Sequence, residues 1–150
     1  MIPHEEWMEA ALDEARRSEA NGEVPVGAVV VHEERIVGRG GNRTETLKDP
    51  TAHAEIFAIR EAAAAIGSWR LLGCAIYVTL EPCAMCAGAL VLSRIDRLVY
   101  GADDPKAGMV GSLANVVQDP RLNHRVEVER GILAEECGEL LRAFFRKRRG

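Results

Sequence analysis

Two short fragments of this chain, Thr51–Glu55 and Leu80–Cys86, constrain its fold more than any other feature, because together they supply three side chains that bind soft metals. Cys83 and Cys86 are spaced three apart at the start of a predicted helix, so both sulfurs lie on one face and can reach one ion. The positive end of that helix also favours thiolate over thiol. With His53 the cysteines form a set of one nitrogen and two sulfurs, for which zinc is the natural metal.

The number of ligands indicates the kind of site. A structural zinc normally has four protein ligands, whereas a catalytic zinc has three and leaves one position for water. The chain offers one Cys-x-x-Cys pair and one convincing histidine, so we predict a single catalytic zinc per chain, bound by His53, Cys83 and Cys86. Glu55 follows the histidine by two residues and is the expected general acid and base.

The spacing of the two fragments also predicts where they lie. The 27 residues between Glu55 and Cys83 accommodate a helix followed by a strand. Such a crossover brings two helix N-termini together at one edge of a sheet, which is the usual position of a ligand crevice in open α/β sheets.

The hydrophobic pattern predicts the order of the remaining elements. We expect helices over 4–20, 54–66, 83–93 and 133–147, and strands over 26–31, 36–37, 75–80, 98–100 and 126–129. The polar, turn-rich residues 40–52 and 101–111 are predicted loops. This order predicts a single α/β domain over residues 1–150, a three-layer α/β/α sandwich in which a mixed five-stranded sheet carries helices on both faces.

Composition and charge exclude several classes of protein. The formal net charge of -4 argues against a general nucleic-acid binder, although five of the last nine residues are basic and could form a local RNA surface. No apolar run approaches the roughly 18 residues that span a bilayer, and the acidic N-terminus is unlike a secretory signal. We therefore expect a cytoplasmic protein with no membrane partner, whose four cysteines stay reduced.

Longer segments around the metal fragments identify a family. The H-x-E and P-C-x-x-C patterns together are the known signature of zinc-dependent nucleobase deaminases. More specific are the segments Glu23–Ala28, Asp49–Glu55, Tyr77–Gly88, Gly101–Lys106 and Asn123–Arg125. Through them nearly the whole chain resembles the bacterial tRNA-specific adenosine deaminases. The resemblance implies a cytidine-deaminase-like fold, a homodimer, and hydrolytic deamination of adenosine to inosine at the wobble position of a tRNA anticodon loop by zinc-activated water.

The same resemblance implies a role for each site residue. His53, Cys83 and Cys86 would hold zinc, and Glu55 would transfer protons. The implied substrate-binding residues are Val26, Asn42, Leu80 and the backbone of Ala54 around the flipped adenosine, with Asp104 and Asn123 against flanking nucleotides. The last helix would lie on the anticodon stem-loop through Phe145, Arg146 and Arg149. The pattern alone also allows the phenylalanines to be core and the arginines to be a solvated helix end.

Two other functions are compatible with the metal fragments. A deaminase of a free nucleoside, a free nucleotide or guanine would use the same zinc core, because attack on cytosine or on a purine requires the same groups. A non-enzymatic zinc module that binds RNA would need a fourth protein ligand, for which Cys74, Cys137 and His124 are the candidates. The surroundings of these three side chains distinguish the zinc module from an enzyme.

Overall fold

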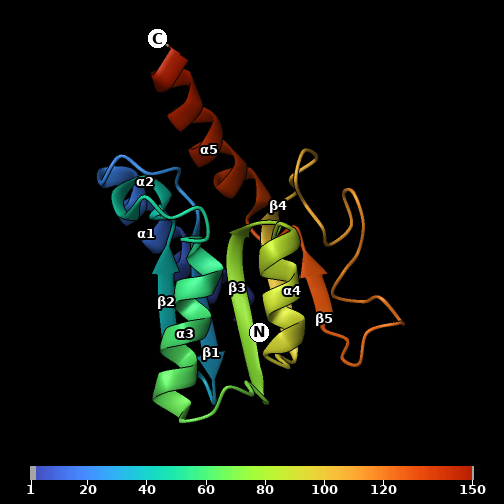
Figure 1. The fold of residues 1–150 in the computed structure, drawn as a ribbon. Coiled ribbons are helices and arrows are strands. Elements are labelled where there is room, and N and C mark those ends of the chain that lie inside the picture. The colour runs from blue at the N-terminus through green and yellow to red at the C-terminus, as the bar shows by residue number, and fades with distance from the viewer. Residues whose placement is uncertain (1–2, 150) are drawn as a thin grey trace.

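The computed structural model describes residues 3–149, whose helices and strands are drawn in Figure 1. The helices are α1 (His4–Ala20), α2 (Thr44–Leu47), α3 (Ala54–Ile66), α4 (Ala84–Leu92) and α5 (Ala134–Arg149). The strands are β1 (Gly27–His32), β2 (Arg35–Gly41), β3 (Cys74–Leu80), β4 (Arg97–Ala102) and β5 (Glu127–Arg130). No helix within the described residues combines the length and the apolar character that a bilayer crossing requires.

The strands form one mixed, five-stranded sheet in the order β2-β1-β3-β4-β5. β1 runs antiparallel to β2 and β3, whereas β3, β4 and β5 are parallel. Parallel neighbours need a crossover connection, and α4 forms the one between β3 and β4. The C-terminal ends of β3 and β4 therefore meet at one edge of the sheet, where Leu80 pairs with Ala102.

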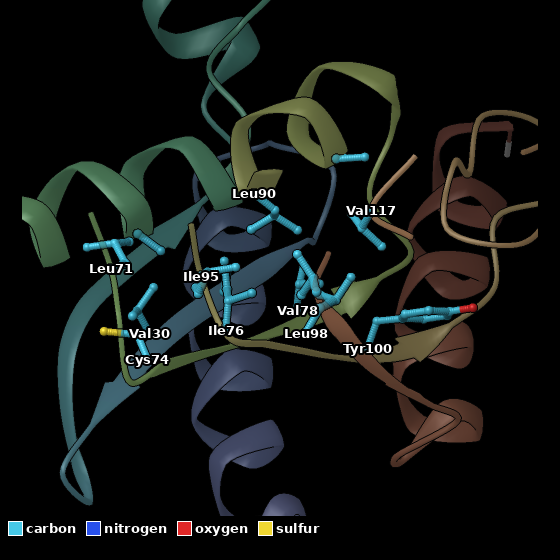
Figure 2. Close-up of a cluster of buried hydrophobic side chains, with 14 of the residues drawn as sticks. Val30, Leu71, Cys74, Ile76, Val78, Leu90, Ile95, Leu98, Tyr100 and Val117 are labelled. Carbon is cyan, nitrogen blue, oxygen red and sulfur yellow. The ribbon is translucent and has the colours of Figure 1, made fainter. Parts of the chain in front are cut away.

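Side chains along β1, β2, β3 and β4 alternate between two apolar clusters, one on either face of the sheet. Ile76 and Val78 of β3 pack against α3 and α4, in the cluster drawn in Figure 2. Tyr77, which lies between them in sequence, packs on the other face with Met8 of α1 and Cys137 of α5. The sheet is thus the middle layer of three.

These observations confirm the predicted α/β/α sandwich and its mixed five-stranded sheet. All the predicted helices and strands are present, and their ends differ from the prediction by at most two residues, with one exception. That exception is β2, which continues to Gly41 instead of ending at residue 37, because its glycines hide the strand pattern. The predicted loop 40–52 also contains the short helix α2.

Two glycines of β2 allow α3 to lie directly on the strand backbone. A Cβ atom on Gly38 would lie 2.2 Å from the carbonyl oxygen of Ala58, and one on Gly40 would lie 2.3 Å from that of Ala54. Real Cβ atoms do not approach other atoms so closely, so any larger residue would push α3 away from β2. Because α3 begins at Ala54, the two glycines fix the height of this helix N-terminus above the sheet.

Replacing Gly40 by alanine is expected to lower the free energy of unfolding by about 1–3 kcal/mol, the usual cost of overpacking a filled core. For a chain of this length the melting temperature should fall by several degrees, measured by circular dichroism. Gly88→Ala is the matched control, because a Cβ on Gly88 of α4 meets no other atom within 4 Å. Equal melting temperatures for the two variants would contradict the close packing of α3 on β2.

Candidate metal centre and substrate cavity

Three potential metal ligands meet where two helices begin. His53 immediately precedes α3 and Cys83 immediately precedes α4, both with an extended backbone, and Cys86 lies in the first turn of α4. The Nδ1 atom of His53 is 3.6 Å from the sulfur of Cys83 and 3.6 Å from the sulfur of Cys86. The three ligand atoms all lie within 4.8 Å of one another.

These distances fit a tetrahedral zinc ion. Zinc lies about 2.3 Å from a cysteine sulfur and about 2.0–2.1 Å from a histidine nitrogen, so a tetrahedral angle places the two ligand atoms about 3.6 Å apart. Both nitrogen–sulfur separations have this value. Among residues 3–149, the cluster contains three potential ligands and no fourth histidine, cysteine or carboxylate. A three-ligand set is the arrangement of catalytic zinc sites.

The candidates for a fourth ligand have other surroundings. The thiol of Cys74 donates a long hydrogen bond of 3.9 Å to the carbonyl oxygen of Leu72. Cys137 is buried among the residues that α1 and the sheet contribute to the second core cluster. The Nε2 atom of His124 is 2.7 Å from the carbonyl oxygen of Ile95. The described part of the chain therefore does not supply the closed site that a non-enzymatic zinc module requires.

Hydrogen bonding and burial prepare the cluster for acid–base chemistry. Hydrogen bonds from Cys86 and His53 lower the pKa of Cys83 to about 3, so this sulfur is a thiolate at neutral pH. Glu55 is only 4% exposed, and burial raises its pKa to about 7. A divalent cation nearby would favour the carboxylate and lower this pKa again. A carboxyl group that titrates near the working pH can both accept and release a proton.

A cavity of about 240 Å³ opens beside the cluster, with His53, Glu55 and Cys83 in its lining. It is smaller than the sites of drug-sized ligands, which occupy roughly 300–1,000 Å³. Five of the predicted substrate-binding residues line it, namely Val26, Asn42, Ala54, Leu80 and Asp104. The lining residues that sequence analysis did not single out are Val24, Thr44, Glu81 and Ala107. The fold thus places one small cavity against both the metal ligands and Glu55.

Asn123 is the predicted substrate-binding residue that is not in the lining of this cavity. Its side chain is exposed, and the next residue, His124, contacts Ile95 just before β4 begins. The cavity, in contrast, lies at the end of β4, where Leu80 pairs with Ala102. Figure 1 shows the chain after β4 passing down the edge of the sheet before it enters β5. Within one chain, Asn123 therefore lies near the opposite end of the sheet from the cavity.

A groove of about 750 Å³ continues from the cavity to α5. Leu80 and Asp104 line both spaces, and Phe145 lines the groove from α5. Phe145 is 45% exposed, whereas Phe144 is buried, so one phenylalanine packs inward and the other faces the groove. In Figure 1 the C-terminal half of α5 extends beyond the sheet.

The predicted basic residues of α5 are only partly described. Arg146 is exposed and forms an ion pair of 2.6 Å with Glu139 on the same helix. Arg148 donates a hydrogen bond of 2.8 Å to the carbonyl oxygen of Gly22, which ties the end of α5 to the turn after α1. The side chain of Arg149 lies outside the described residues.

Two buried glutamates that sequence analysis did not single out hold the loops beside the cavity. Glu23 accepts hydrogen bonds of 2.6–3.1 Å from the N–H groups of Glu45 and Thr46 and from the Thr46 hydroxyl, and so fixes α2. Burial raises the pKa of Glu23, but these hydrogen bonds outweigh it and hold the pKa below its ordinary value. Glu81 binds the loop after β4 in the same way. The one feature of the sequence that points to Glu81 is its position two residues before Cys83.

The fold and the cluster define the class: this is a deaminase with the cytidine-deaminase-like fold, and residues 2–149 match the MafB19-like deaminase family. The chain is 52% identical over 149 residues to the tRNA-specific adenosine deaminase of Bacillus subtilis strain 168, over 99% of this chain and 92% of that relative. It therefore belongs to the family of tRNA-specific adenosine deaminases.

Solved structures agree with this family. A structure from a study of A-to-I editing by tRNA:A34 deaminases at the wobble position of transfer RNA matches with a TM-score of 0.87 at 49% identity, over 91% of this chain and 99% of that chain. A guanine deaminase from Nitrosomonas europaea matches with a TM-score of 0.80 at 27% identity, over 93% and 83%. The fold is thus shared by deaminases of different bases, and the higher identity is with the tRNA deaminase.

Proposed function

We propose that the whole chain is one zinc-dependent deaminase domain that acts in the cytoplasm and hydrolyses the wobble adenosine of a tRNA anticodon loop to inosine. The observation that carries the proposal is the cavity, which has Glu55 and two of the metal ligands among lining residues expected around a flipped base. Identity to a tRNA-specific relative over 99% of the chain supports tRNA as the substrate rather than a free base.

The cavity suits a base that has left its stack. A base paired within a stem cannot reach such a site, whereas a loop nucleotide can be extruded at little cost. Val26 and Leu80 offer apolar surface for a purine ring. The Asn42 amide is held by two weak hydrogen bonds of 3.4 Å, one donated to the Val24 carbonyl and one accepted from the Thr44 N–H. A side chain oriented in this way can bind the polar edge of the nucleoside.

Zinc held by His53, Cys83 and Cys86 would supply a Lewis acid that ionises water near neutral pH. Glu55 carries the proton transfers. Its carboxylate accepts one proton from the attacking water and passes it to the ring nitrogen beside C6; it then accepts the second proton from the new C6 hydroxyl and passes it to the departing amine. A C–O bond forms at C6, the C–N bond to the amine breaks, and ammonia leaves. The burial of Glu55 keeps these protons from bulk solvent.

The groove between the cavity and α5 is the surface that we propose for the rest of the anticodon loop. Phe145 offers a ring on which a base can stack. Lys106 and Arg142 line the same groove; Lys106 can contact phosphates directly, and Arg142 can do so by exchanging its ion pairs with Glu135 and Glu139. Arg146, which pairs with Glu139, and Arg149 continue the basic sequence along α5. This local charge would allow a chain with a net charge of -4 to bind RNA.

We also propose that the enzyme acts as a homodimer. The described surface includes large apolar side chains of which 59–70% is exposed, namely Trp69, Leu72, Leu92 and Leu113. Apolar surface of this kind is typical of protein interfaces when it is contiguous. A light-scattering mass equal to a single chain would contradict the dimer.

An anticodon stem-loop assay tests the proposed function. The zinc-loaded protein is expected to form inosine at one loop position and to leave free adenosine, cytidine and guanine unchanged, as measured by mass spectrometry of the digested RNA and of the free compounds. Incubation with a chelator should abolish the reaction. A stem-loop whose adenosine is moved into the stem is the control and should not react, because a paired base is costly to extrude. Reaction of free guanine or a free nucleoside alone would overturn the tRNA proposal.

A further inference from the structure

We propose that Glu81 is a positioning residue, which fixes the loop on one side of the cavity against the segment that carries Cys83. The proposal rests on the proposed function in one respect, because it assumes that the substrate base binds in this cavity. Glu81 follows the last residue of β3 and is only 2% exposed. A carboxylate in such a place must be satisfied by hydrogen bonds, and its partners reveal what it holds.

All four hydrogen bonds to the Glu81 carboxylate come from the loop between β4 and β5. Oε1 accepts the N–H of Asp104 at 3.0 Å and the hydroxyl of Ser112. Oε2 accepts the N–H groups of Val110 and Ser112, both at 3.0 Å. The three backbone partners can only donate, so a carboxamide would direct its own N–H groups at donors. A carboxylate is therefore the one group of this shape that can accept the hydrogen bonds of all the loop donors.

The loop held in this way forms part of the cavity wall. Asp104 and Ala107 line the cavity, and Gly108 follows them. A Cβ atom on Gly108 would lie 2.3–2.5 Å from the three atoms of the Glu81 carboxyl group. The loop backbone therefore rests on the carboxylate with no space for a side chain between them.

The same loop is also bonded to the metal-binding segment. The N–H of Met109 donates a hydrogen bond of 2.9 Å to the carbonyl oxygen of Pro82, which directly precedes Cys83. Glu81 thus lies between the cavity wall and a metal ligand and joins the two. It does not serve as a second acid or base, because both of its oxygens are occupied by loop donors.

Two substitutions break this clamp from opposite sides. Glu81→Gln keeps the shape of the side chain but presents N–H groups to donors. Gly108→Ala instead keeps the carboxylate and adds a methyl group that forces loop and carboxylate apart. The matched control is Glu14→Gln, because Glu14 is also buried but holds no loop. Its Oε2 atom forms no hydrogen bond among the described residues and lies 3.7 Å from Arg39 and 3.9 Å from Arg17. Each zinc-loaded variant is assayed for kcat and KM on the stem-loop, zinc content, and amide hydrogen exchange of residues 104–112.

Both clamp variants are expected to raise KM and lower kcat/KM by roughly tenfold or more, with a smaller change in kcat, because substrate binding is disturbed and the reacting groups are not. Zinc content should match that of the wild type. The amides of Asp104, Val110 and Ser112 should on average exchange roughly tenfold faster, since Glu81→Gln leaves one acceptor oxygen in place of two and Gly108→Ala separates the loop from the carboxylate. Glu14→Gln should match the wild type in every measurement.

Wild-type KM and wild-type loop exchange in both clamp variants would overturn the proposal. If Glu81→Gln loses zinc or does not fold, Gly108→Ala decides whether the clamp exists, because this substitution lies in the loop and not in the segment that carries Cys83. A wild-type protein that forms no inosine would instead refute the proposed function. In that case the exchange of the loop amides still tests whether Glu81 holds the loop.

Discussion

Replacing Glu55 by alanine should lower the rate of inosine formation by roughly 10²–10⁴-fold, the usual contribution of a general acid and base. The structure supports this expectation because Glu55 is buried in the lining of the cavity, where burial raises its pKa to about 7. Zinc content should remain near that of the wild type, since the metal cluster consists of other residues. Single-turnover kinetics with the stem-loop and metal analysis of the same sample measure both quantities.

The matched control for this experiment is Glu61→Ala. Glu61 lies on the same helix, α3, but is exposed to solvent, so its loss should leave both rate and zinc content unchanged. Glu55→Gln adds a second test, because it preserves the shape of the side chain while removing its ability to accept a proton. Substantial turnover by either zinc-loaded Glu55 variant would refute the proton-transfer role.

Replacing Cys83 or Cys86 by alanine should remove most of the zinc and with it the activity. A site with two of its three ligands holds a metal far less tightly. Because metal binding stabilises the folded state, weaker binding also lowers the free energy of unfolding. At a free zinc concentration about 1,000 times the dissociation constant, binding stabilises the folded state by about 4 kcal/mol. For a chain of this length the melting temperature should therefore fall by about 8–16 °C.

Cys74→Ala and Cys137→Ala are the controls for that experiment. Both cysteines are buried, so the substitutions create similar small cavities, but neither belongs to the metal cluster. They should retain zinc and activity, and chelator treatment of the wild type should reproduce the loss of stability in the Cys83 and Cys86 variants. A full zinc complement in both of those variants would rule out the proposed ligand set.

The metal cluster and the fold were accessible from sequence because both follow from local patterns. His53 and Cys83 each stand at the start of an apolar helical repeat, so the positions of two helix N-termini could be predicted. The alternation of β3 between two cores likewise follows from its own residues. In each case a segment shorter than about twenty residues contained the signal.

Contacts between distant segments could not be predicted in this way. Glu81 binds donors that lie 23–31 residues further along the chain, and no local pattern indicates that this glutamate is a buried acceptor. The glycines of β2 lower its strand propensity, and only the position of α3 explains why they are needed. Asn123 was assigned by resemblance, and the path of the chain after β4 places it away from the cavity lining.

The contact of α3 with bare strand backbone restricts how this active site can be altered by directed evolution. The glycines at this contact have no side chain that can be trimmed to gain room, and enlarging Gly38 or Gly40 would displace His53 and Glu55 together. Variant libraries that aim to accept a different base should therefore leave this side of the molecule unchanged. Diversity is better concentrated in Ala107, which lines the cavity from a loop, and in Thr44, the first residue of the short helix α2, because both can change in size without moving α3.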